Sequence, residues 1–193
     1  MNNNNKWRWI YNPFEYVAGW KAFGIGVVLL AIATITGYFG NIVFYALEIK
    51  SVPDIPWGMA FSLQALGLGV TVGIMYSTAL LFTKHTRFQD IMGTVTLAKY
   101  PLLLIALLSL VFGKEMASID VSKIINHELD FSGYALLSAF AITAIVVLVW
   151  EIALLYNAFR VSTNLKGLKC VVLFMLAVLV SEIATLLLKS VIC

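Results

Sequence analysis

Long apolar stretches separated by short polar ones dominate the chain. A helix that crosses roughly 30 Å of hydrocarbon needs about 20 apolar residues, because each residue rises about 1.5 Å. By this criterion the sequence predicts an all-α fold, a polytopic membrane helical bundle with five transmembrane helices and a short N-terminal interfacial segment. The predicted segment covers residues 1–21, the transmembrane domain covers residues 22–193, and the spans lie at about 22–47, 57–82, 91–113, 131–156 and 168–188.

The third predicted span differs from the others because it contains both a lysine and a proline. Its charge-free part, residues 100–113, is too short to cross a membrane alone, so the helix must begin near Ile91 and include Lys99 and Pro101. Proline removes a backbone donor from a helix, and neighbouring groups in a membrane protein can satisfy the freed carbonyl. We therefore predict a kink at Pro101.

Residues 1–21 mix aromatic with charged side chains, among them Tyr11, Phe14, Glu15, Trp20 and Lys21. Such a mixture is typical of a segment that lies in the headgroup region, where Trp and Tyr are enriched. We expect the segment to anchor the first span as part of an aromatic belt. Recruitment of a partner by the same segment is the alternative.

Composition and charge agree with a membrane location. Hydrophobic residues make up 61% of the chain and charged residues 12%, against roughly 45–50% and 25% in soluble domains. Of the 13 Lys and Arg residues, nine fall on the side of the N-terminus and four on the other side of the predicted spans. Because short cytoplasmic loops collect Lys and Arg, we predict a multi-pass protein of the cell inner (cytoplasmic) membrane, with a cytoplasmic N-terminus and an outer C-terminus. A net charge of only +3 predicts no nucleic-acid partner.

Small residues recur every four positions along one face of the second span: Ala65, Gly69, Gly73 and Ser77. Helices in lipid pack through small residues that let their backbones approach, and Gly69 with Gly73 forms a GxxxG motif. We expect this face to pack within the bundle. Contacts between copies in a homo-oligomer are the alternative.

Three charged residues fall inside predicted spans: Lys99, Glu151 and Glu182. A charge at the bilayer centre costs about 2.5–3.5 kcal/mol on insertion scales, so each should face protein or water. Lys99 and Glu151 lie at similar depths, about 9–12 Å from the inner end of their helices at 1.5 Å per residue. We expect them to form a structural pair, and ion or proton handling is the alternative.

Glu182 has no basic residue at a matching depth. Low dielectric favours the neutral form of a carboxyl group, which can donate a hydrogen bond. Glu182 could therefore hydrogen-bond to a hydroxyl on the fourth span, such as Thr143 or Ser138. A role in a proton relay is the alternative.

Motifs that carry chemistry do not stand out in this sequence. His85 and His127 fall on opposite sides of the predicted membrane, and no Cys/His cluster supplies the ligands of a zinc site. The glycine patterns of nucleotide-binding loops are absent, and no serine or threonine has an evident base. We expect no enzymatic activity, no catalytic residues, no metal and no cofactor.

Four short strings suggest a family: NPFE at residues 12–15, TRFQDI at 86–91, AKYP at 98–101 and LYNAFRVSTNLKG at 155–167. They resemble bacterial members of the Yip domain family, integral membrane proteins named for Ypt/Rab-interacting proteins, and the similarity covers essentially the whole chain. The resemblance implies five spans, a cytoplasmic N-terminus and no catalytic residues. Eukaryotic members are tied to vesicle trafficking, membrane shaping and binding of prenylated Rab GTPases, and a bacterial cell lacks such partners.

We therefore expect a non-enzymatic membrane protein of the Yip type that organises membranes or binds a partner at its cytoplasmic face. The candidate residues of that face are Arg87, Asp90, Asn157, Arg160, Asn164 and Lys166. Besides the lipid bilayer itself, anionic lipid headgroups or another membrane protein would suit such a face. The alternative is a small transporter, channel or lipid-moving protein that uses Lys99, Glu151 and Glu182 along a hydrated path. No internal repeat supports the transporter interpretation.

Overall fold

The computed structural model describes residues 8–52, 54–83, 86–117 and 130–192, so the first seven residues of the predicted N-terminal segment lie outside it. Five helical stretches are long and apolar enough to cross a membrane, which confirms the predicted helical bundle. They are α2 (Gly19–Phe39), α3 (Trp57–Phe82), α4 (Phe88–Ala98) together with α5 (Leu102–Ala117), α7 (Phe131–Thr163) and α8 (Gly167–Ile192). A short helix α1 (Arg8–Tyr11) and a 3₁₀ turn η2 (Pro13–Glu15) precede them.

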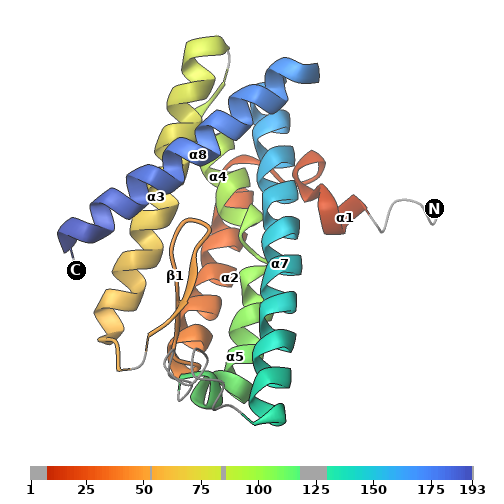
Figure 1. Ribbon diagram of the computed structural model, residues 1–193. Coiled ribbons are helices and arrows are strands. Elements are labelled where there is room, and N and C mark those ends of the chain that lie inside the picture. The colour runs from red at the N-terminus through yellow and green to blue at the C-terminus, as the bar shows by residue number, and fades with distance from the viewer. Residues whose placement is uncertain (1–7, 53, 84–85, 118–129, 193) are drawn as a thin grey trace.

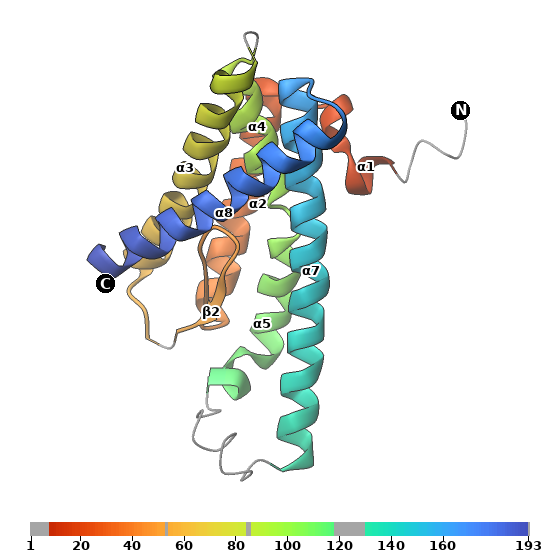
Figure 2. The ribbon, with the colours of Figure 1, turned by 45° about the horizontal axis from the view of Figure 1, so that its top comes forward.

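One end of the bundle carries α1, the start of α2, the end of α3 and the junction between α7 and α8 (Figure 1). We call it the N-terminal end. The other end carries the C-terminal turns of α2 and α5 and the start of α7. In both views α8 runs obliquely across the other helices, and it packs mainly against α3 (Figure 2).

The third span breaks between α4 and α5 at Lys99, Tyr100 and Pro101, as predicted. Pro101 has no N–H to offer to the carbonyl of Leu97 four residues earlier. The amide of Tyr100 donates to that carbonyl instead, at 3.1 Å, and the amide of Leu103 donates to Tyr100 at 3.1 Å. The tighter bonds keep the backbone satisfied while the helix changes direction.

The first predicted span is wrong beyond residue 39. The helix α2 ends at Phe39 rather than at residue 47, and the chain turns back through Asn41, whose φ of 56° is left-handed. Two strands follow, β1 (Ile42–Phe44) and β2 (Ile49–Ser51), and they pair antiparallel. Asparagine adopts the left-handed region more readily than most residues, so the turn is encoded locally.

This β-hairpin folds back into the bundle, where its first strand packs against α2, α3 and α5 (Figure 2). Residues 43–46 are buried. Non-helical backbone at membrane depth is tolerated only where protein surrounds it and its polar groups are paired. Gly67 of α3 makes room for the hairpin, because a Cβ there would lie 2.5 Å from the backbone carbonyl carbon of Tyr45.

The third span, which consists of α4 and α5, is the most enclosed of the five, with 56% of its most apolar stretch buried against 11% for α7. Within this span, α4 packs most closely against α2. It lies closely along α2, and Gly93 permits the approach, since a Cβ there would fall 2.2 Å from the carbonyl oxygen of Gly19. Tight contact of this kind holds helices together in lipid, where the hydrophobic effect between them is weak. The α4 face of α2 therefore forms the centre of the bundle.

The helix α7 extends seven residues beyond the predicted span, which ended at residue 156. Its 33 residues measure about 50 Å at 1.5 Å each, well beyond a hydrocarbon core of roughly 30 Å. The first turn is capped by Asp130, which accepts hydrogen bonds from the Ser132 hydroxyl and, at 3.0 Å, from the Gly133 amide. These bonds hold the pKa of the Asp130 carboxyl below its usual range. The helix ends at Asn164 with a left-handed φ of 54°.

The predicted packing face of the second span points away from the bundle. Ala65, Gly69, Gly73 and Ser77 are all exposed on α3, and a Cβ at Gly69 or Gly73 would meet nothing within 4 Å among the described residues. The buried face of α3 instead includes Gln64, Gly67 and Thr71. Contacts of the small-residue face with a second copy stay a prediction.

Candidate functional site

The break between α4 and α5 places Lys99 opposite Glu151 of α7. The Lys99 ammonium lies 2.9 Å from Oε1 of Glu151, and the two side chains are 0% and 1% exposed. The structure thus brings the two predicted partners together in a dry setting. A charge pair enclosed in this way holds helices in register, because either charge alone would be strongly unfavourable.

The same ammonium also donates to the backbone carbonyl of Ala46, at the tip of the β-hairpin. A carbonyl at a turn has no strand partner, so the lysine supplies the donor that lipid cannot. Oε2 of Glu151 is buried without a hydrogen-bond partner in the part of the chain that the structure describes. Lys99 therefore links α4, α7 and the hairpin.

Glu182 of α8 also faces the hairpin tip. The backbone N–H of Leu47 hydrogen-bonds to its carboxyl group, and Lys99 is near enough to interact with it electrostatically. The expected partners on the fourth span are wrong: Thr143 donates to Ala139 at 2.8 Å and Ser138 donates to Tyr134 at 2.7 Å, each along its own helix. Hydroxyls in helices commonly make this bond to the preceding turn.

A second ion pair completes the attachment of the hairpin. Lys189 of α8 lies 2.9 Å from the Glu48 carboxylate, and its ammonium sits 4.0 Å from the ring centroid of Tyr45. This pair was not predicted from the sequence, because the first span was expected to continue as a helix to residue 47, directly before Glu48. Three successive tip residues, 46, 47 and 48, are thus held by Lys99, Glu182 and Lys189 in turn.

The N-terminal segment docks on the helices through its backbone carbonyls. The carbonyl of Ile10 accepts hydrogen bonds from the Tyr100 hydroxyl at 2.6 Å and from the Trp150 indole at 2.9 Å. The carbonyl of Tyr11 accepts from the Asn157 amide at 2.8 Å, and Phe14 is buried. The segment therefore forms part of the folded protein at the N-terminal end of the bundle.

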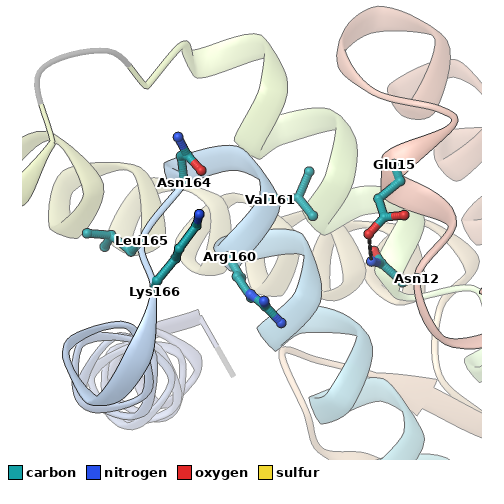
Figure 3. Close-up of a pocket in the computed structure, with 7 residues that line it drawn as sticks. All are labelled: Asn12, Glu15, Arg160, Val161, Asn164, Leu165 and Lys166. Atoms are coloured by element: carbon teal, nitrogen blue, oxygen red, sulfur yellow. Dashed lines mark hydrogen bonds between the residues drawn. The ribbon is translucent and has the colours of Figure 1, made fainter.

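This docking creates a polar cavity of about 270 Å³ between the segment and the junction of α7 with α8. Figure 3 shows the residues that line it, which are Asn12, Glu15, Arg160, Val161, Asn164, Leu165 and Lys166. We call it the headgroup-level cavity, because α7 is longer than the hydrocarbon core and we expect the end that carries the charged Arg160 to lie outside that core. Two of the lining residues, Arg160 and Lys166, have cationic side chains, and both residues are exposed.

Asn12 was not among the predicted site residues, and only part of its amide group is hydrogen-bonded. Its amide nitrogen donates to Oε1 of Glu15 at 2.8 Å. Its amide oxygen is buried and, among the described residues, has no hydrogen-bond partner. Such an acceptor is ready to receive a donor from water or from a ligand.

The six residues predicted for the cytoplasmic face lie in different parts of the structure. Arg160, Asn164 and Lys166 line the cavity, whereas Asn157 holds the N-terminal segment. Arg87 precedes α4 at an exposed position.

Asp90, in the first turn of α4, has its carboxylate beside Gly19, at a helix N-terminus where a negative charge is favourable. It therefore has a structural explanation of its own. His85 and His127 lie outside the described residues.

No protein-family model, curated protein or solved structure gives a significant match to this chain. The class of protein rests on the fold itself. Five helices of sufficient length and apolarity make the chain a multi-pass membrane protein with a helical-bundle domain.

Proposed function

We propose that this chain is a non-enzymatic membrane protein of the Yip type that organises the membrane by binding anionic lipid headgroups at the N-terminal end of its bundle. The observation that carries the proposal is the headgroup-level cavity, which places Arg160 and Lys166 around a space built by the docked N-terminal segment. Basic pockets at the surface end of transmembrane helices are a known way to hold anionic headgroups. The resemblance of the four sequence strings to the Yip family supports the same assignment.

The charge asymmetry of the sequence supports a cytoplasmic location for this end, in a bacterial inner membrane. The cytoplasmic leaflet of a membrane is the one whose anionic lipids attract Lys and Arg, at about 1 kcal/mol per residue near the surface. Arg160 can also bind a phosphate group with two parallel hydrogen bonds, which a lysine cannot do. The cavity is therefore suited to a phosphate group at the membrane surface.

A role in transport has less support. It would use Lys99, Glu151 and Glu182 along a hydrated path, yet the side chains of the first two are 0% and 1% exposed and paired with each other. All three also contact the hairpin or its partners, which explains their presence in the membrane core. A structural role therefore explains these three charges, and no transport of ions or lipids is needed to explain them.

Lipid retention tests the proposal. The protein is reconstituted in vesicles of phosphatidylcholine with a minor fraction of an anionic phospholipid and then released for native mass spectrometry. We expect the wild type to retain anionic lipid. We expect the double variant Arg160→Gln/Lys166→Gln to lose about 2 kcal/mol of binding, or roughly thirty-fold in affinity.

A matched control changes two exposed lysines outside the cavity, Lys21→Gln/Lys50→Gln, and removes the same formal charge. It should retain anionic lipid like the wild type. Equal losses in both double variants would mean that diffuse surface charge, rather than the cavity, attracts the lipid, and the proposal would then be wrong.

A further inference from the structure

The headgroup-level cavity has two chemically different walls. Arg160 and Lys166 come from the end of α7 and its junction with α8, and they present cationic donors (Figure 3). Asn12 and Glu15 come from the N-terminal segment on the other side, and they present oxygen atoms. A ligand that fits both walls needs an acceptor-rich anionic part and a part that donates hydrogen bonds.

Charge limits the choice of ligand. Arg160 and Lys166 carry two positive charges and Glu15 one negative charge, so the formal charge of the lining is +1. A phosphodiester, which carries one negative charge, neutralises this lining. A zwitterionic headgroup leaves the lining charge uncompensated, because its own net charge is zero.

The Asn12 amide oxygen indicates the chemistry of the hydrogen-bond-donating part of the ligand. It is buried and lacks a partner among the described residues, while the nitrogen of the same amide is already committed to Glu15. A buried acceptor without a donor is unfavourable, so a hydroxyl group placed against it would be favoured over an apolar group. A neutral hydroxyl supplies this donor without changing the charge balance.

Volume and position agree with a headgroup as the occupant. About 270 Å³ lies just below the range of pockets that enclose drug-sized molecules, so it suits a headgroup and not a whole lipid. The acyl chains would remain along the exposed apolar surface of the neighbouring helices. We propose that the cavity selects phospholipids with a phosphoglycerol headgroup, an inference that rests on the proposed function. Arg160 and Lys166 would bind the phosphate, and a glycerol hydroxyl would donate a hydrogen bond to Asn12.

The test compares two lipids of equal charge and equal acyl chains. Phosphatidylglycerol has the hydroxyl donors, and phosphatidylmethanol carries a methyl group in their place. Vesicles of phosphatidylcholine that contain equal fractions of both are used, and retained lipids are counted by native mass spectrometry. We expect the wild type to prefer phosphatidylglycerol about five-fold, the effect of one added hydrogen bond.

Variants separate the two parts of the site. Asn12→Leu should abolish the preference for phosphatidylglycerol over phosphatidylmethanol, whereas Arg160→Gln should lower the retention of both lipids. Gln89→Leu is the matched control, an amide replaced by leucine in α4 outside the cavity lining, and should keep the five-fold preference. The thermal unfolding temperature of each variant in detergent shows whether it is folded.

The wild-type comparison needs no variant and so decides the inference even if Asn12→Leu fails to fold. Equal retention of the two lipids, with both dependent on Arg160, would overturn the phosphoglycerol assignment and leave the proposed function in place. Retention of neither lipid would overturn both. Displacement of the lipid by water-soluble glycerophosphoglycerol at comparable concentration would assign the cavity to a soluble ester and overturn the lipid assignment.

Discussion

Breaking the Lys99–Glu151 pair should destabilise the protein far more than removing it. The single change Glu151→Leu leaves the Lys99 ammonium buried at 0% exposure, with the Ala46 carbonyl as its remaining hydrogen-bond partner among the described residues. The single change Lys99→Met leaves the Glu151 carboxyl without its donor. A buried charge that loses its partner costs about 3–5 kcal/mol, so each single variant should lose about that much unfolding free energy.

The double variant Lys99→Met/Glu151→Leu removes both charges together. Well-packed apolar residues can replace a buried pair with little loss of stability. The Ala46 carbonyl still loses the donor that Lys99 provides, and an unsatisfied buried acceptor costs about 1–3 kcal/mol. We therefore expect the double variant to be more stable than either single variant and slightly less stable than the wild type.

Unfolding by sodium dodecyl sulfate in mixed micelles, followed by circular dichroism, measures all four proteins of this double-mutant cycle. The control is the pair of Lys189 and Glu48, whose side chains are 18% and 35% exposed. Its removal should cost less than breaking the Lys99–Glu151 pair, because both side chains are only partly buried and solvent weakens the charge that is left behind. The reasoning fails if the single changes at Lys99 and Glu151 are harmless, or if their losses simply add in the double variant.

Three further changes test other parts of the fold. Gly67→Ala should destabilise the protein by about 1–3 kcal/mol in the same assay, because the new methyl group meets the hairpin backbone; Gly69→Ala, on the exposed face, should be neutral or slightly stabilising. Trp150→Phe removes one donor to the Ile10 carbonyl, so hydrogen exchange in the N-terminal segment should become faster. The lowered pKa of Asp130 stabilises α7 above the carboxyl's usual pKa, and this contribution is lost as the pH falls through the folded-state value. Relative to the intrinsic exchange rate at each pH, the first turn of α7 should accordingly be less protected in acid, and Asp130→Asn should remove that pH dependence of the protection. Wild-type exchange in Trp150→Phe, or a wild-type pH dependence of protection in Asp130→Asn, would refute the assigned contact.

Hydropathy predicted those features of the fold that depend only on whether a residue prefers lipid or water. The second span was placed at residues 57–82, which are the bounds of α3, because polar loops border it on both sides. The break at Pro101 followed from the chemistry of proline. The proximity of Lys99 and Glu151 followed from their similar depth, since an intramembrane charge needs a partner.

The β-hairpin was missed because an apolar run does not reveal its backbone conformation. Residues 22–47 contain no charge, so a buried hairpin and a continuing helix have the same hydropathy. What distinguishes them is the left-handed turn at Asn41 and the space above Gly67, and the second of these exists only in the folded bundle. The end of α7 was misplaced for a related reason, since a helix can continue into water with polar residues.

No cavity was predicted from the sequence, but three of its seven lining residues were among the predicted residues of the cytoplasmic face. Arg160, Asn164 and Lys166 were grouped because they are near one another in the sequence. Asn12 lies about 150 residues away and joins them only because the backbone carbonyls of Ile10 and Tyr11 dock on α7 and on the break between α4 and α5. No periodicity or composition in the sequence reports such contacts.

Flux across reconstituted vesicles tests most directly whether this protein works at its surface or through its interior. Proton, cation and fluorescent-lipid flux would be measured for the wild type, Glu151→Gln and Glu182→Gln beside empty liposomes. If the intramembrane charges serve only to hold the hairpin and the helices, no sample should exceed the empty liposomes. Flux that depends on the protein and disappears with either substitution would contradict this account and assign the buried charges to a transport path.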